Sequence, residues 1–176
     1  MKTKFLFILV ICLLAALPAM SQTVTYFHGE TPVFSVKMPN GWEFETKPNP
    51  RDAMTKRISG MAPNGYVWFG VWIVKNGKTV DQAYKYVQGV AKTLILDAKE
   101  TKTPVTGEVN GMKAKFSEHQ GTMKMKDGKS QLFNAKVTLF ETGGRVGIAA
   151  VVADADGMKA ESANIETFFK SIRAVK

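Results

Sequence analysis

The sequence predicts an α+β protein, an α/β/α sandwich in which a single, mostly antiparallel sheet carries a helix on each face. Three observations predict this class. Residues 66–74 form a run that is apolar on both faces of an extended strand. Residues 105–153 alternate polar and apolar side chains between turn-forming pairs such as Asn-Gly and Gly-Gly. Residues 79–95 and 158–172 carry apolar positions at three- and four-residue steps, which is typical of amphipathic helices.

The run from Tyr66 to Val74 is the organising strand of this prediction. Alternate side chains of a strand point to opposite faces, so Phe69 and Ile73 share one face while Trp68 and Trp72 share the other. Both faces are apolar. We therefore expect an interior strand with material packed above and below it.

The first 21 residues have the features of a cleaved signal peptide. Lys2 and Lys4 precede an apolar run, Phe5 to Leu17, and small residues stand at the cleavage positions, which predicts cleavage before Gln22. The run is shorter than the roughly 20 apolar residues of a spanning helix, so we expect no transmembrane segment in the mature chain. Residues 22–176 are then expected to form a single domain of a periplasmic or secreted protein.

Cysteine usage and charge exclude several functions. Cys12 is the one cysteine and belongs to the leader, so the mature chain has no disulfide, thiol nucleophile or thiolate metal site. Removal of Lys2 and Lys4 lowers the net charge from +9 to +7. A basic surface suits anionic partners such as lipid head groups, and an exported protein is not expected to meet nucleic acid.

Strands are predicted for the first part of the mature chain. Pro39-Asn40-Gly41 supplies the proline and glycine of a tight bend between two alternating segments. Asn64-Gly65 turns the chain into the central strand. The predicted strands are Thr23–Phe27, Phe34–Met38, Trp42–Thr46 and Ala53–Met61, with a loop at Lys47–Arg51.

The helix predicted from Thr79 begins with a capping signal. Gln82 follows Thr79 after three residues, and Asp81 places negative charge at the positive end of the helix. Turns are then predicted at Asn110-Gly111, Asp127-Gly128 and Gly143-Gly144, which divide residues 105–153 into a meander. Asp154-Ala155-Asp156-Gly157 is interpreted as a turn and N-cap before the last helix.

Three local patterns resemble those of the PsbP/DcrB-like superfamily. They are Pro39-Asn40-Gly41-Trp42 after a strand, Val109-Asn110-Gly111 at a hairpin, and Phe168-Phe169-Lys170-Ser171-Ile172 in the final helix. The resemblance covers nearly the whole mature chain. It implies a small, often exported α/β/α sandwich that acts as an accessory or binding protein rather than as an enzyme, and it carries over no binding residue.

The ionisable residues give little support to an enzyme or a metal site. His28 and His119 are the only histidines of the sequence, whereas a zinc site needs three or four converging ligands. The sequence has no G-X-S-X-G elbow. We therefore expect no catalytic residue, no metal and no cofactor, and an enzyme of unknown reaction is the third choice.

Two features suggest binding, and the first is a pair of tryptophans. Trp68 and Trp72 share a strand face with Gly70 between them, so the two indoles could flank a slot for a flat or apolar ligand. The alternative is that Tyr84 and Val87 of the helix fill this gap as ordinary core.

The second feature is a display of lysines on the meander. If the hairpins pair in register, several of these lysines project from neighbouring strands or turns and form a basic patch for anionic lipid or an acidic partner. The alternative is a solvated edge that lysines protect from aggregation. The six residues are Lys113, Lys115, Lys124, Lys126, Lys129 and Lys136.

The sequence thus predicts an exported, non-enzymatic accessory or binding protein of the cell envelope that acts through a surface. Its expected partner is an unknown protein or an anionic envelope surface. The alternative function is a carrier of a small apolar ligand held near Trp68 and Trp72.

Overall fold

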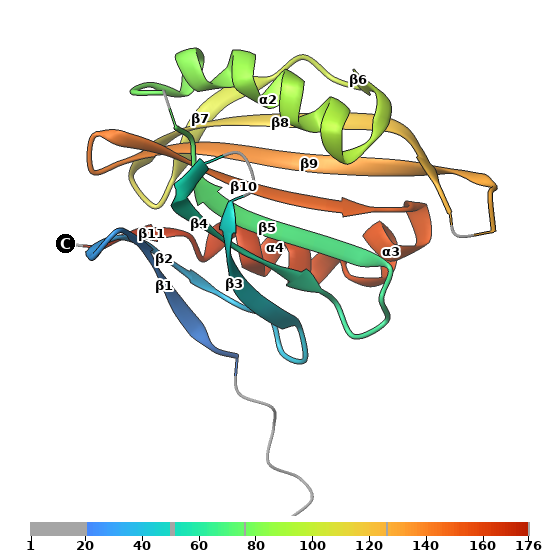
Figure 1. The fold of residues 1–176 in the computed structure, drawn as a ribbon, viewed down its shortest axis with the longest axis horizontal. Helices are drawn as coiled ribbons and strands as arrows, with labels where there is room; N and C mark the ends of the chain where they lie inside the picture. The colour runs from blue at the N-terminus through green and yellow to red at the C-terminus, as the bar shows by residue number, and fades with distance from the viewer. Residues whose placement is uncertain (1–20, 50–51, 76, 126, 176) are drawn as a thin grey trace, which may run out of the picture.

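A computed structural model describes residues 21–49, 52–75, 77–125 and 127–175, and Figure 1 shows how they fold. The predicted signal peptide, apart from its last residue, lies outside the described residues. Within the described part of the chain, no helix is both long enough and apolar enough to cross a bilayer.

The main sheet has eight strands, and each pairs with its neighbours in antiparallel fashion. Their order is β3-β4-β5-β10-β9-β8-β6, with β7 also paired to β8. The strands are β3 (Glu43–Asn49), β4 (Asp52–Met61), β5 (Val67–Ile73), β6 (Leu96–Glu100), β7 (Val105–Val109), β8 (Met112–Lys124), β9 (Ser130–Thr142) and β10 (Arg145–Ala153).

The central run is an interior strand, as the sequence predicted. β5 lies between β4 and β10, and Phe69 and Ile73 are buried on one of its faces. On the other face Trp72 is buried and Trp68 is half-buried. The α+β class with a mostly antiparallel main sheet is therefore confirmed.

A second, three-stranded sheet differs from the predicted single sheet. It pairs β1 (Thr23–His28), β2 (Thr31–Lys37) and β11 (Arg173–Ala174). Phe34 of β2 is fully buried, because its ring stacks on Tyr26 at 4.7 Å between centroids and meets Phe140 of the main sheet edge-on at 5.0 Å. The bend at Pro39-Asn40-Gly41 therefore carries the chain from one sheet to the other and does not close a hairpin.

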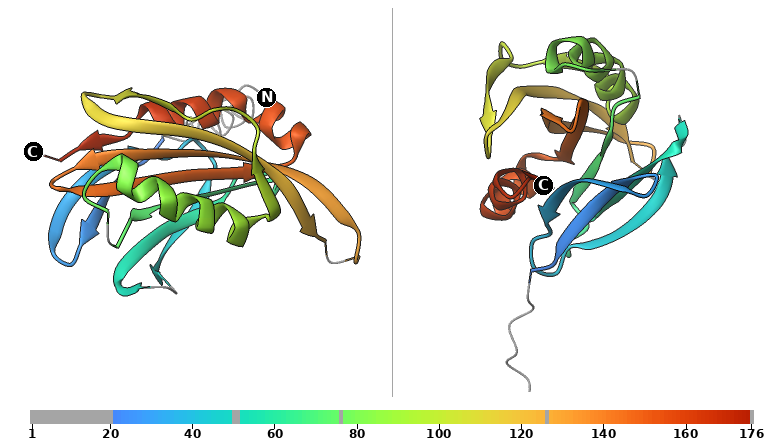
Figure 2. Two further views of the ribbon diagram at one scale, coloured as in Figure 1. Left: turned by 90° about the horizontal axis from the view of Figure 1, so that it is seen from above. Right: turned by 90° about the vertical axis from the view of Figure 1, so that its left-hand side faces the viewer.

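The helices lie on opposite faces of the main sheet (Figures 1 and 2). α2 (Val80–Leu94) covers the face that carries Trp72, and its own residues Val80, Ala83 and Val87 are buried. α3 (Ala155–Ala160) and α4 (Ser162–Lys170) follow β10, and Phe168 of α4 packs on Phe69 of the other face. That face is thus shared by α4 and the small sheet.

Three boundaries differ from those predicted. The last helix is two short helices that meet at Glu161, and the first begins at Ala155 because the Asp154 carboxylate accepts a hydrogen bond of 2.7 Å from the Gly157 amide. β3 continues into the predicted loop as far as Asn49. β6 was not predicted at all, since its five residues LDAKE include only Leu96 and Ala98 as apolar positions. The turn and N-cap interpreted at Asp154 are confirmed.

The three patterns behind the family resemblance meet at α4. Trp42 lies 4.9 Å from Phe69 and 5.9 Å from Phe168 between ring centroids, and its indole N–H donates to Glu161. The Asn110 side-chain amide donates to the carbonyl oxygens of Lys170 and Ile172, each at 2.7 Å. Three separate segments of the sequence therefore pack together where α4 attaches to the rest of the protein.

We predict that Phe168→Ala destabilises the protein by about 3–5 kcal/mol, because it leaves a cavity between Trp42 and Phe69 in a fully buried cluster. Urea unfolding of the purified variant measures this loss. Phe27→Ala is the control, since Phe27 is 44% exposed and its loss should cost no more than about 0.5 kcal/mol. Equal, small losses in both variants would contradict the docking of α4.

We predict that Asn110→Gly lowers the unfolding free energy by about 1–3 kcal/mol, because two carbonyl groups at the end of α4 lose their donor. Asn110→Ala should cost about 1–2 kcal/mol more, since Asn110 has φ of +47°, which alanine adopts with strain. Unfolding curves for both variants separate the two effects. Identical curves for Asn110→Gly and the wild type would show that the side-chain hydrogen bonds contribute nothing.

Candidate functional site: an apolar groove beside Trp68

The described residues enclose an apolar groove at one end of the main sheet, on the face of Trp68. Its volume is about 390 Å³. We call it the Trp68 groove. Residues of β4, β5, β8, β9 and β10, and of the turn before β5, line it. They are Met61, Gly65, Tyr66, Trp68, Met123, Met125, Gln131, Phe133, Val152 and Asp154.

Strand register explains why these side chains meet. Met61 is the partner of Trp68, and Trp68 is the partner of Val152, so the three stand in one row across the sheet. Met123 lies opposite Gln131 in the β8–β9 hairpin, and alternation puts Met125 and Phe133 on the same face as this pair. The floor of the groove is therefore sheet, and its far wall is the hairpin.

The groove is open because α2 does not reach this end of the sheet. The helix ends at Leu94, the side chains of α2 that the structure describes do not line the groove, and the β8–β9 hairpin extends beyond the helix in Figure 1. Three apolar side chains at the mouth consequently stay exposed: Met61 by 40%, Tyr66 by 63% and Met125 by 39%. A cluster of exposed apolar side chains around a concave surface is typical of a binding site.

The Gln131 and Asp154 side chains of the lining are already hydrogen-bonded. The Gln131 side-chain amide donates to one Asp154 carboxylate oxygen at 2.7 Å, and the Gly157 amide donates to the other at 2.7 Å. These contacts fix the N-terminus of α3 and leave an apolar interior. The groove thus suits an apolar ligand better than a polar one.

The predicted slot between Trp68 and Trp72 is closed by the indoles themselves. A Cβ atom on Gly70 would lie 2.8 Å from Cη2 of Trp68 and 3.1 Å from Cζ3 of Trp72, so both rings lie over the glycine. The open volume lies instead at Trp68, away from Trp72. A ligand role for Trp68, Gly70 and Trp72 stays a prediction, with Trp68 the member that lines the groove.

Several residues of the groove were not predicted from the sequence, because the pattern around them only weakly indicates a binding site. Met123 and Met125 alternate with lysines beside the Asp127-Gly128 turn, a pattern equally typical of the ordinary core. Met61 and Phe133 belong to other strands. Only the pairing of these strands brings the four side chains together.

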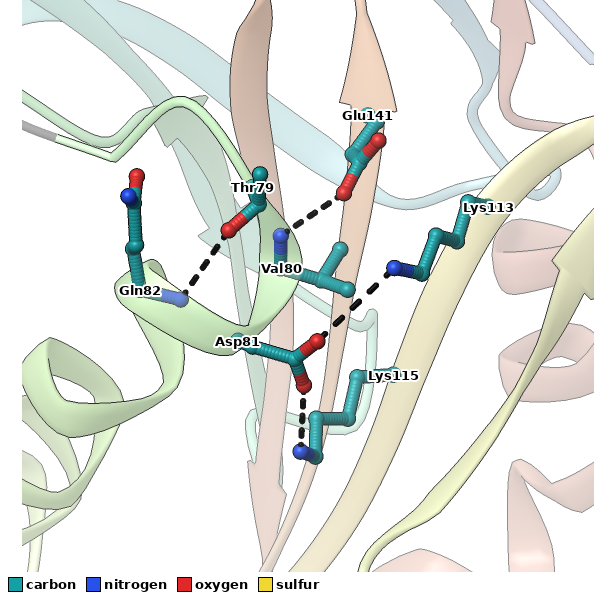
Figure 3. Close-up of polar contacts among 7 residues, drawn as sticks. All are labelled: Thr79, Val80, Asp81, Gln82, Lys113, Lys115 and Glu141. Carbon is teal, nitrogen blue, oxygen red and sulfur yellow. Dashed lines mark hydrogen bonds and ion pairs between the residues drawn. The ribbon is translucent and has the colours of Figure 1, made fainter.

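Two of the six predicted lysines belong to the attachment of α2 rather than to a free surface. Lys115 Nζ lies 2.8 Å and Lys113 Nζ lies 3.7 Å from the Asp81 carboxylate (Figure 3). The hydrogen bond and charge of Lys115, followed by the charge of Lys113, lower the pKa of Asp81. Lys115 also lies over the Tyr84 ring at 4.7 Å.

The helix begins beside these lysines with two further contacts. The Val80 amide donates to Glu141 at 3.0 Å, and the Gln82 amide donates to the Thr79 hydroxyl at 3.3 Å (Figure 3). The Gln82 side-chain oxygen accepts a hydrogen bond from the backbone amide of Lys78, whereas the predicted capping box would use the backbone amide of Thr79. The N-terminus of α2 is thereby fixed at the end of the sheet opposite the groove.

The remaining predicted lysines do not join the first two. Lys136 is on β9 and lies on the face of α4, since its strand partner Val151 pairs with Phe69. Lys124 ends β8 and Lys129 lies in the following turn, near the groove, while Lys126 is outside the described residues. The five described lysines thus lie at three separate positions: the N-terminus of α2, the face of α4 and the β8–β9 hairpin. An anionic-surface role for the lysines stays a prediction.

His119 and Ser117 form a buried pair on β8. His119 Nε2 lies 3.0 Å from the Ser117 hydroxyl, and both side chains are buried. Such a pair could act as base and nucleophile, but neither residue lines the Trp68 groove. Among the described residues, no three His, Cys, Asp or Glu side chains converge as a metal site would require.

We predict that burial of His119 makes the protein less stable at acidic pH. Burial lowers the pKa of His119, against a smaller opposing effect of the Glu100 charge. The unfolded chain therefore binds more protons below about pH 6.5, so the unfolding free energy should fall as pH is lowered from 7 toward 5. His119→Gln should flatten this slope in urea titrations, and an unchanged slope would contradict the assignment.

Comparison with known proteins finds similarity at the level of the fold. No family model matches the sequence, and no curated protein matches it. The solution structure of CyanoP, the cyanobacterial PsbP of a Synechocystis species, matches with a TM-score of 0.59 and 11% identity, over 89% of this chain and 94% of that one.

Two further structures are similar. A crystal structure from Bacteroides thetaiotaomicron matches with a TM-score of 0.52 and 11% identity over 81% of this chain, which spans only 45% of that protein. LpqN of Mycobacterium tuberculosis, described as involved in cell envelope biogenesis, gives a TM-score of 0.48 at 12% identity over 89% of this chain and 92% of that one, and supports no conclusion. At 11% identity the match to CyanoP shows the fold alone. The predicted resemblance is confirmed at that level: the chain has a PsbP-like fold.

Proposed function

We propose that this protein is an exported, non-enzymatic binding protein that holds a small apolar molecule in the Trp68 groove. The observation that carries the proposal is the apolar, open lining of the groove beneath the exposed side chains of Met61, Tyr66 and Met125. Export is supported by the signal-peptide pattern of residues 1–21.

The size of the groove selects the kind of occupant. A water molecule takes up about 30 Å³ of liquid, and a methylene group is of similar size, so about 390 Å³ gives room for roughly a dozen carbon atoms. This matches a single aliphatic chain or a small ring system. Met61, Met123 and Met125 add adaptable walls, because the unbranched thioether side chain changes shape easily.

The polar chemistry of the groove supports binding rather than catalysis. Gln131 and Asp154 bond to each other, and Asp154 also caps α3, so the carboxylate already has a structural task. A general base or nucleophile needs a polar group directed at the substrate. The buried pair of His119 and Ser117 does not supply one, since it is outside the lining.

The anionic-surface role predicted for the lysines is the second candidate, now centred on the hairpin. Lys124 and Lys129 flank the wall of the groove formed by Met125. A surface that combines these cations with exposed apolar side chains would suit the head-group region of a membrane. Lys113 and Lys115 contribute less to it, because both face Asp81.

We predict that the neutral fluorescent probe N-phenyl-1-naphthylamine binds the mature protein, and that Met125→Glu weakens its binding by about tenfold or more. The reason is that the substitution places a charge against an apolar occupant. Leu132→Glu is the matched control, because Leu132 is also an exposed apolar residue of the same hairpin (52% against 39% for Met125) but points to the opposite face.

Probe fluorescence titrations of the three proteins decide between the outcomes. Weakened binding in Met125→Glu with unchanged binding in Leu132→Glu supports the groove. Equal effects of the two substitutions would place the probe elsewhere on the hairpin. Absence of binding to the wild type would overturn the proposed function.

A further inference from the structure

Arg57, which has no carboxylate partner among the described residues, lies close to Trp68. Arg57 on β4 is the direct strand partner of Trp72, so the two side chains share the face of the groove. The Arg57 guanidinium carbon lies 5.8 Å from the centre of the Trp68 ring. Trp68 therefore lies close to the Arg57 cation and also lines the apolar groove.

A side-chain N–H group on each of these two paired residues lacks an acceptor among the described residues. Arg57 Nε and Trp72 Nε1 are both buried and make no hydrogen bond. No ion pair joins Arg57 to a carboxylate of the described residues either. Buried donors are nearly always satisfied in folded proteins, and a partly buried cation without a counter-ion is unfavourable. Two such donors on adjacent strands indicate a place for an acceptor that the described residues do not provide.

We infer that Arg57 and Trp72 form a head-group site, and that the ligand of the Trp68 groove is a single-chain amphiphile with a carboxylate at one end. The inference rests on the proposed function and adds the chemical class of the ligand. The aliphatic chain occupies the space lined by Met61, Met123 and Met125. The carboxylate passes the edge of Trp68 and accepts from Arg57.

The chemistry of the two donors favours a carboxylate over a neutral head. A guanidinium presents parallel N–H groups that match the two oxygens of a carboxylate, and such charge-assisted hydrogen bonds are about twice as strong as neutral ones. The indole N–H of Trp72 adds a third donor from the neighbouring strand. A hydroxyl head group would accept only one of these bonds and would leave the arginine charge unpaired.

The test compares two ligands that differ only in the head group. Dodecanoate and dodecanol, each below its aggregation concentration, displace N-phenyl-1-naphthylamine from the mature protein at pH 7.5. The wild type should bind dodecanoate at least about tenfold more tightly than dodecanol, because one charge-assisted hydrogen bond changes the affinity by about this factor. Arg57→Gln should remove this preference while its dodecanol affinity stays within about twofold.

Two further variants control for charge and for folding. Lys56→Gln removes a positive charge from the neighbouring residue of the same strand, which points to the opposite face and is exposed, so the preference should persist. Arg57→Lys keeps the charge with fewer donors and should retain part of the preference. Thermal unfolding of each variant confirms that the compared proteins are folded.

The possible results distinguish the two proposals. Equal affinities of the wild type for dodecanoate and dodecanol would overturn the head-group site and leave the apolar groove intact. A preference that survives Arg57→Gln would also overturn it, and would move the anion to another cation such as Lys124 or Lys129. If neither ligand displaces the probe, the proposed function fails together with the head-group site.

Discussion

The attachment of α4 through Phe168 is the contact on which the rest of the structure depends. The ring lies fully buried against Phe69 of the central strand and Trp42 of the chain that crosses between the sheets. Three parts of the chain that are distant in sequence must be folded before this cluster can form. Its burial therefore links the small sheet, the main sheet and the last helix into one hydrophobic core.

Incomplete coverage of the opposite face creates the candidate site. The N-terminus of α2 is fixed at one end of the sheet by Asp81 and by the Val80 amide, and the helix ends before it reaches the other end. Apolar strand residues that a longer helix would bury instead line the Trp68 groove. The same physical constraint, a sheet face that needs an apolar cover, thus produces both the core beneath α2 and the open groove beyond it.

The sequence supported the fold more strongly than the site because the two depend on different information. Alternation in residues 66–74 and the glycine turns of the meander are local signals, and the interior position of β5 follows from them. The groove depends on which strands pair. Met61 and Met123 belong to strands that three others separate in the sheet, so no local pattern relates them. The tryptophan hypothesis placed an open space between Trp68 and Trp72, whereas the groove of the structure lies beside Trp68.

By itself the sequence determined the antiparallel α+β class, the two amphipathic helical regions and the interior strand, because hydrophobic periodicity and turn chemistry are local properties. Only the tertiary structure decided that β1 and β2 leave the main sheet, that Lys113 and Lys115 serve α2, and that Arg57 lies beside Trp68. These features arise from long-range packing. Strand register and the length of α2 determine which side chains meet, and no single stretch of the sequence specifies either of them.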